Sequence, residues 1–150
     1  MMQLNLPTYT FRIKKKDEKY TIYDSLRRKY VPLTPEEWVR QNFVSFLINE
    51  RKFPQGLIAN EQKVMINNQP KRCDTIVYDN HSEPLMVVEY KSPYVEITQE
   101  VFDQIAVYNT ELKVKYLIVT NGLVHICCKI NLVDNTYIYL PKIPDYIELN

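Results

Sequence analysis

The chain has 150 residues, and 45% of them are hydrophobic, so it is long enough for one domain with a core of its own. Its 19 lysines and arginines nearly balance its 18 acidic residues, and the net charge of +1 excludes binding of a polyanion through overall charge and leaves only local basic clusters. No apolar run approaches a membrane span, no signal-peptide core is visible, and the three cysteines lack CxxC spacing. We therefore expect a cytoplasmic protein with no membrane contact, no disulfide framework and no zinc site.

The opening segment, residues 1–33, alternates short apolar and polar runs. TFRI and YTIY flank the polar stretch KKKDEK, and KYVPL follows a basic segment, which predicts a β-hairpin or three-stranded meander before the main domain. The next segment, TPEEWVRQNFVSFLINE, begins with helix start signals. Thr34 is a candidate N-cap, Pro35 suits the first helical position, and Glu37 completes a T-x-x-E capping box. These signals predict a helix from about Pro35 to Glu50.

The rest of the chain alternates predicted strands with one more helix. KVMIN is a candidate strand, KRCDTIVYDNHSEPLMVVEYKSP indicates a hairpin, and ITQEVFDQIAVYNTEL predicts a helix capped by Thr98 or begun just before it. KYLIVT is typical of a buried strand, an Asn-Gly turn leads into LVHICCKI, and TYIYLP is a last strand. The predicted fold is α/β, with a mixed sheet and two helices. The core covers residues 34–129, and residues 130–150 form a C-terminal strand and tail.

The predicted hairpin carries charges at positions that are otherwise typical of a core. If Asp79 pairs with Pro84 across the tip, Asp74 lies directly opposite Glu89, with Cβ atoms about 5 Å apart. Lys91 projects from the same face as Glu89, because strand side chains alternate. Opposed carboxylates repel unless a cation lies between them, and Mg²⁺ needs only one or two protein carboxylates. The alternative is a salt-bridge cluster at the sheet edge.

The second predicted helix has an inward stripe that contains one polar residue. The stripe consists of Ile97, Val101, Gln104 with Ile105, Tyr108 and Leu112. Gln104 and Tyr108 lie four residues apart and so share one face of the helix. Taken alone, Gln104 is better explained as a glutamine at the core edge with its hydrogen bonds satisfied.

These residues together resemble a known family. Asp74 followed by Glu89-Tyr90-Lys91 resembles the D…E-x-K centre of the PD-(D/E)XK nucleases. The later Gln104…Tyr108 resembles the Q-x-x-x-Y motif of recombination nucleases and type I restriction enzymes. The surrounding sequence extends the resemblance to the N-terminal nuclease domain of type I restriction enzyme R subunits, in a short, stand-alone form, over roughly residues 9–129. The segments that carry it are TPEEWVRQNFV, GLIANE, RCDTIVYD, VVEYKSP, TQEVFDQIAVYN and KYLIVTNG.

The resemblance implies a restriction-endonuclease-like fold and a metal-dependent centre. Asp74 and Glu89 would bind Mg²⁺, or Mn²⁺ in its place, with the backbone carbonyl of Tyr90 as a third ligand. Lys91 matches the lysine that positions the attacking water. The implied activity is hydrolysis of DNA phosphodiester bonds.

The resemblance also assigns roles outside the hairpin. Gln104 and Tyr108 would support the site, and Tyr108 would touch the nucleic acid. Families of this type use an acidic residue from the first helix, a place that Glu37 fits and for which Glu61 competes. The capping box is an equally good explanation of Glu37.

The proposed substrate needs phosphate contacts, and we expect them from Lys71 and Arg72, with the basic cluster at residues 27–29 as a further candidate. The rival interpretation is a non-catalytic DNA-binding or protein-docking module of a restriction or repair complex. A nuclease acting on RNA or branched DNA is a third. Because 150 residues leave no room for the helicase motor of the R subunits, a separate helicase, translocase or restriction-complex subunit is an expected partner.

Overall fold

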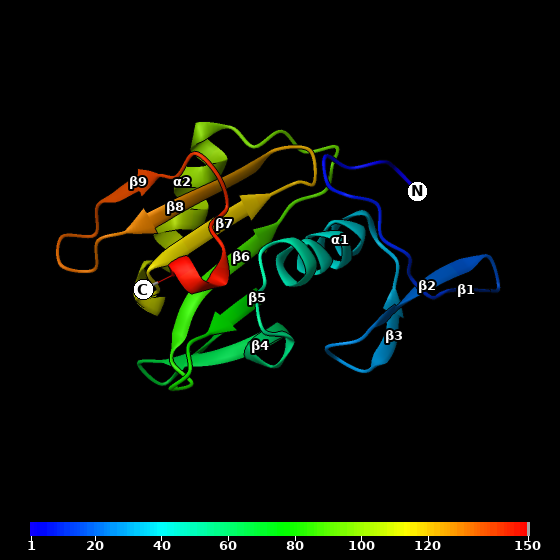
Figure 1. Cartoon of the computed structure of the whole chain (residues 1–150), viewed down its shortest axis with the longest axis horizontal. Helices are drawn as coiled ribbons and strands as arrows, with labels where there is room; N and C mark the ends of the chain where they lie inside the picture. The colour runs from blue at the N-terminus through cyan, green and yellow to red at the C-terminus, as the bar shows by residue number, and fades with distance from the viewer. Residues whose placement is uncertain (150) are drawn as a thin grey trace.

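The N-terminal part forms a small sheet of its own. The computed structural model describes residues 1–149, and Figure 1 shows this sheet beside α1, away from α2. Its strands run antiparallel in the order β1 (Ile13–Lys16), β2 (Lys19–Asp24) and β3 (Lys29–Pro32). Ile22 and Val31 are paired across β2 and β3 and are both buried. The predicted three-stranded meander is confirmed.

The main sheet has six strands, ordered β4-β5-β6-β7-β8-β9. β6 and β7 are parallel and every other pair is antiparallel, so the predicted mixed sheet is confirmed. The parallel pair requires a crossover, and α2 lies within it. The strands are β4 (Ile58–Ile66), β5 (Gln69–Tyr78), β6 (Pro84–Tyr90), β7 (Tyr116–Thr120), β8 (His125–Ile130) and β9 (Tyr137–Tyr139).

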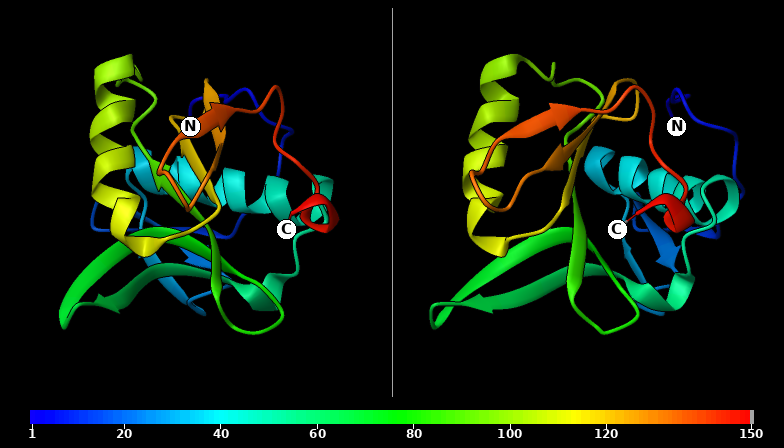
Figure 2. Two further views of the ribbon diagram at one scale, coloured as in Figure 1. Left: turned by 90° about the vertical axis from the view of Figure 1, so that its left-hand side faces the viewer. Right: turned by 60° about the vertical axis from the view of Figure 1, so that its left-hand side comes forward.

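Two α-helices cover the opposite faces of the main sheet (Figure 2). They are α1 (Pro35–Glu50) and α2 (Gln99–Asn109), and short 3₁₀ turns occur at Gln55–Leu57, Thr110–Leu112 and Tyr146–Glu148. The predicted bounds of α1 are confirmed. The hydroxyls of Thr34 and Thr98 accept hydrogen bonds from backbone N–H groups in the first turns of α1 and α2. Within residues 1–149 no helix is long and apolar enough to cross a membrane.

The central strands are buried on both faces because each helix needs an apolar surface to pack against. On the α1 face, Phe43 packs with Met86 and Val88. On the α2 face, Phe102 packs with Val87, which lies between those two residues in β6. Glu89 follows Val87 at the spacing of one strand face and therefore points toward α2.

The predicted inward stripe is confirmed in part: Ile97, Ile105 and Leu112 pack in the core on the α2 side of the sheet. It is wrong at Val101, Gln104 and Tyr108. The residues of α2 that are fully buried are Phe102 and Asn109, whereas Gln104 is exposed and the side chain of Tyr108 is 55% exposed. One residue corresponds to about 100° of rotation about the helix axis. Burial of the large Phe102 ring removes more apolar surface from water than burial of Val101, and this sets the helix rotation.

Candidate functional site

The pairing of β5 with β6 sets the two candidate metal ligands side by side. Thr75 pairs with Val88 at the offset that the sequence predicts. One further step along the two strands brings Asp74 opposite Glu89. Glu89 faces α2, and the Asp74 carboxyl group is close enough to raise the pKa of Glu89. The predicted juxtaposition of the two carboxylates is therefore present.

The expected pairing at the hairpin tip is wrong, although the offset below it is right. Pro84 pairs with Tyr78 and not with Asp79, because the register shifts at a bulge that leaves Leu85 as an extra residue in β6. Asp79 belongs to the turn, where its N–H donates to the carbonyl of Glu83 at 2.9 Å. The pairing at the tip is one residue off the prediction, and the extra residue at the bulge restores the predicted offset. The lower part of the hairpin therefore keeps the predicted register.

Asp74 and Glu89 differ in how their oxygens are satisfied. Oδ2 of Asp74 accepts a 3.0 Å hydrogen bond from the backbone N–H of Tyr90. Oε1 of Glu89 is buried and has no hydrogen-bond partner among the described residues. A buried carboxylate oxygen without a donor is unfavourable unless it is protonated or binds a cation. Glu89 therefore holds a proton at neutral pH or offers this oxygen to a cation beside Asp74.

The pKa of Glu89 reflects this environment. Burial raises it most, the neighbouring Asp74 carboxyl group raises it further, and the result is a pKa of about 8. The Asn109 side chain and the Lys91 ammonium act in the opposite direction. Lys91 is half-buried, and its N–H donates to the carbonyl of Thr120 at 2.9 Å, which extends the β6–β7 pairing past the end of β6. Lys91 thus lies near enough to Glu89 to influence its charge.

Asn109 is the residue of α2 that faces the site, and the sequence interpretation missed it. It is 1% exposed, and its Nδ2 donates to the carbonyl of Ile105 at 2.9 Å. Its Oδ1 is buried without a hydrogen-bond partner within residues 1–149. An asparagine on the inward face of a helix that packs against a carboxylate is a recognisable signal of a site residue. Recognising Asn109 requires the correct rotation of α2, and the predicted stripe did not include it.

The two motif residues on α2 lie at the surface. Gln104 lines a shallow depression with Glu100, Asp103 and Val107, and it makes no hydrogen bond to another described side chain. The Tyr108 ring contacts β5 through Lys71, whose ammonium lies 3.9 Å from the ring centre. The structure therefore connects Tyr108 to the strand that carries Asp74, and leaves Gln104 facing solvent.

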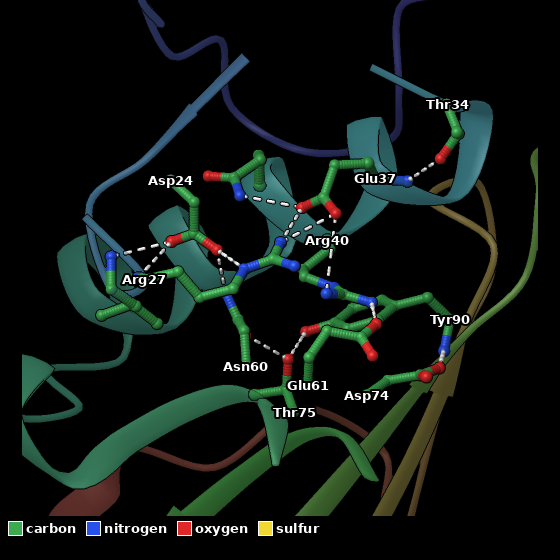
Figure 3. Close-up of polar contacts among 12 residues, drawn as sticks. Asp24, Arg27, Thr34, Glu37, Arg40, Asn60, Glu61, Asp74, Thr75 and Tyr90 are labelled. Atoms are coloured by element: carbon green, nitrogen blue, oxygen red, sulfur yellow. Dashed lines mark hydrogen bonds and ion pairs between the residues drawn. The ribbon is translucent and has the colours of Figure 1, made fainter. Parts of the chain in front are cut away.

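Glu37 lies on the opposite side of the sheet, in an ion network (Figure 3). Both of its carboxylate oxygens accept from Nη2 of Arg27 at 2.8 Å, and one also accepts from Nε2 of Gln41 at 2.9 Å. It makes only half of the predicted capping box, because the N–H of Thr34 donates to the carbonyl of Pro32. The Glu37 carboxylate anchors the N-terminal sheet to α1.

Glu61 occupies the next position in this network. It accepts a hydrogen bond from Nη2 of Arg40 and forms an ion pair with Nε of Arg72 at 2.6 Å. Burial acts to raise its pKa, but the hydrogen bond and charge of Arg40 outweigh burial and hold the pKa below its ordinary value. Neither Glu37 nor Glu61 joins Asp74 and Glu89: across residues 1–149, no three His, Cys, Asp or Glu side chains are arranged to hold a metal.

A chain of hydrogen bonds links the N-terminal sheet to the candidate site (Figure 3). Asp24 accepts from Nδ2 of Asn60 at 3.0 Å, and Oδ1 of Asn60 accepts from the Thr75 hydroxyl at 2.6 Å. The Tyr90 hydroxyl donates to Thr75 at 2.9 Å, and the Tyr90 backbone holds Asp74. Residues from β2, β4, β5 and β6 therefore share one buried polar network.

The comparison with protein families gives a match. A family model described as type I restriction enzyme R protein N-terminus matches residues 35–144. The chain belongs to this family. The match begins at the first residue of α1 and includes all six strands of the main sheet, so the main sheet belongs to the R-protein N-terminus domain. The N-terminal sheet lies outside the match. No curated protein matches the chain.

The donor set of this R-protein N-terminus domain fits Mg²⁺ better than a softer metal. Asp74 and Glu89 supply hard carboxylate oxygens, and Mg²⁺ usually keeps several waters while binding only one or two carboxylates. A structural zinc site needs four protein ligands, usually from Cys and His. The unpartnered oxygen of Glu89 is the observation on which this fit depends.

Proposed function

We propose that this domain is a metal-dependent deoxyribonuclease that hydrolyses DNA phosphodiester bonds at Asp74, Glu89 and Lys91. The main support is the paired carboxylates, of which Glu89 has a buried oxygen with no hydrogen-bond donor among residues 1–149. Membership of the type I R-protein N-terminus family supports a restriction-related role. A bound Mg²⁺ would polarise the phosphodiester and lower the pKa of a water molecule.

The residues of the chain itself would bind the cation, orient the attacking water and keep Asp74 in place. Asp74 and Glu89 would hold the cation, with the Tyr90 carbonyl as a further oxygen ligand. Lys91 would hold the attacking water in line with the scissile bond, since its ammonium can donate hydrogen bonds in three directions. Tyr90 keeps Asp74 in place through its backbone N–H.

DNA would reach the site across the β4–β5 ribbon. The Arg72 side chain is 65% exposed although it pairs with Glu61, so its other guanidinium donors remain available to a phosphate. Lys71 rests on the Tyr108 ring, which fixes the direction of its ammonium. Arg72 and Tyr108, which are exposed, would therefore position the backbone without reading sequence, whereas Lys71, which is buried at 8% exposure, would act by holding the Tyr108 ring.

A second candidate function is a non-catalytic module that binds DNA or docks a separate translocase. The observation that favours it is the engagement of Glu37 and Glu61 by arginines, which leaves only two carboxylates at the candidate centre. Such a module would bind DNA through the same surface and leave cleavage to a partner subunit.

Nicking of supercoiled plasmid in Mg²⁺ or Mn²⁺ tests the proposal, with metal binding followed by calorimetry. We expect the native chain to cut and Asp74→Asn to lose both metal affinity and cleavage, because a neutral amide is a poorer Mg²⁺ ligand. Lys91→Ala should lose cleavage yet bind the metal at least as tightly, since a competing cation is gone. Glu83→Gln, at the exposed hairpin tip, is the matched control and should cut normally.

Three outcomes would contradict the proposal. Cleavage that survives EDTA excludes the metal, and equal activity in all variants excludes these residues. Absence of cleavage in every variant, together with tight binding to duplex DNA, would establish the non-catalytic module instead. An RNA substrate run in parallel would show whether DNA is the substrate.

A further inference from the structure

The charges of the chain are unevenly distributed between its two sheets. Residues 1–33 contain eight lysines and arginines and three acidic residues, whereas residues 34–150 contain 11 and 15. The N-terminal part is therefore strongly basic, with a net charge of +5, and the rest is acidic, with −4. The near-neutral total conceals a local cationic region that lies outside the family match.

The register of the small sheet separates its two faces. Ile22 and Val31 pair across β2 and β3 and are buried, and Asp24 on the same face bonds Asn60 of the main sheet. The opposite face follows from strand alternation. Its cationic and aromatic residues, which we name the basic face, are Arg12, Lys14, Lys16, Lys19, Tyr23 and Tyr30.

The tyrosines of the basic face organise its cations. The Arg12 guanidinium lies 3.9 Å from the centre of the Tyr23 ring, and the Lys14 ammonium lies 4.1 Å from that of Tyr30. The two rings contact edge to face, with centroids 5.2 Å apart. Side chains that rest on rings lose less conformational entropy when they bind a ligand, so this face is pre-organised.

The basic face carries no compensating carboxylate. Within residues 1–149 none of its four cations lies within ion-pair distance of an acidic group. Lys15 forms an ion pair with Glu18 at 3.4 Å, but Lys15 lies on the other face of the sheet. Four unpaired cations on one surface attract a polyanion.

We infer that the basic face binds the phosphate backbone of double-stranded DNA and serves as a second DNA contact of this domain. The identity of the polyanion rests on the proposed function. Cations cover the Tyr23 and Tyr30 rings, so these rings are not free platforms for stacking of unpaired bases. Lysines, an arginine and tyrosine hydroxyls are the groups that contact duplex phosphates, and they carry no sequence information.

The test compares two triple variants in a Lys91→Ala background, which keeps the DNA intact. Lys14→Gln/Lys16→Gln/Lys19→Gln removes three of the four cations of the basic face. Lys115→Gln/Lys129→Gln/Lys142→Gln is the control, because it removes the same charge from exposed positions of the acidic part. The probe is a fluorescent duplex of random sequence, titrated at several salt concentrations. The basic-face variant should bind roughly tenfold more weakly at low salt and lower the slope of log affinity against log salt by about 2.7, the value for three lost phosphate contacts.

The result can be separated from that of the proposed function. If native protein never cuts DNA but the basic-face variant alone loses binding, hydrolysis fails and the inference stands. If native protein cuts and the basic-face variant binds as the control does, the inference is overturned. It is also overturned if the variant only aggregates, which would show that the lysines protect the edge of β1, or if it loses binding to phosphatidylserine vesicles and not to DNA.

Discussion

The backbone N–H of Tyr90 donates a 3.0 Å hydrogen bond to Oδ2 of Asp74. The side chain of the same tyrosine points to the other face of the sheet, where its hydroxyl donates to Thr75. Tyr90 stands between Glu89 and Lys91, so a shift of its ring would move both neighbours. The buried network on the α1 face thereby holds the candidate site on the α2 face.

Thr75→Val should destabilise the fold by about 2 kcal/mol, because it leaves two buried polar groups without partners. These groups are the hydroxyl of Tyr90 and Oδ1 of Asn60. Chemical denaturation measures the loss of unfolding free energy. Thr75→Ser keeps the hydroxyl and loses only a methyl group, so it should cost clearly less. If Ser and Val cost the same, the hydrogen-bond chain contributes nothing to stability.

Asp24→Asn should be among the most destabilising single changes, at about 2–4 kcal/mol. Asp24 accepts from Asn60, the N–H of Leu26 and Arg27, so an amide NH₂ would face donors. Burial acts to raise the pKa of Asp24, but hydrogen bonds from Asn60 and Arg27 outweigh it and lower the pKa. The native chain therefore loses stability as pH falls through this lowered pKa, and the variant lacks that loss.

Thermal unfolding at neutral and acidic pH checks the Asp24 prediction. Asp17→Asn is the control, since Asp17 is exposed in the β1–β2 turn at φ 53°, a conformation that asparagine tolerates well. A gap between native chain and Asp24→Asn that does not narrow on acidification would contradict the role of the Asp24 charge.

Local signals in the sequence were sufficient for α1 and for the hairpin. Thr34 and Pro35 set the start of α1 by rules that need no tertiary contact. The hairpin offset was predictable because a strand buried on both faces still alternates, and an error of one residue would turn Glu89 to the other face. The bulge was not predictable, since nothing in the sequence distinguishes Leu85 as the extra residue.

The rotation of α2 and the ion network could not be predicted because both depend on distant contacts. Asp24 and Asn60 lie 36 residues apart and meet only when β2 packs against β4. Glu37 satisfies the capping pattern in sequence, yet Nη2 of Arg27, which donates to both of its carboxylate oxygens, competes successfully for the carboxylate. Charge-assisted hydrogen bonds of this kind are invisible until the chain is folded.

Asn109→Ala should weaken Mg²⁺ binding at neutral pH and much less at alkaline pH. The Asn109 side chain lowers the pKa of Glu89, so its removal should make a proton compete more strongly with the metal. Affinity should fall about tenfold for each unit by which that pKa rises. Calorimetric titration at two pH values measures the effect, with Gln104→Ala on the exposed face of α2 as control. An equal loss at both pH values would point to a purely structural role.

The raised pKa of Glu89 also predicts how stability depends on pH in metal-free protein. The pKa of an isolated glutamate is about 4.5, whereas burial and Asp74 raise the pKa of Glu89 in the folded chain to about 8. Between these values the folded chain holds a proton that the unfolded chain has released. Its stabilising contribution is therefore complete below the unfolded pKa and is lost as pH rises through the folded one, by up to about 1.4 kcal/mol per pH unit.

Glu89→Gln should remove this loss, because an amide does not ionise. In EDTA, the variant should match the native chain near pH 4 and unfold at a higher temperature than the native chain near pH 8. Glu83→Gln, which changes an exposed glutamate of the same hairpin, should follow the native curve throughout. Added Mg²⁺ should stabilise the native chain at pH 8 and leave Glu89→Gln nearly unchanged, since binding to the folded state alone raises its stability. If the unfolding temperatures of the native chain and Glu89→Gln run parallel from acid to alkaline pH, Glu89 is ionised in the folded chain. The two carboxylates would then need a bound cation to lie side by side.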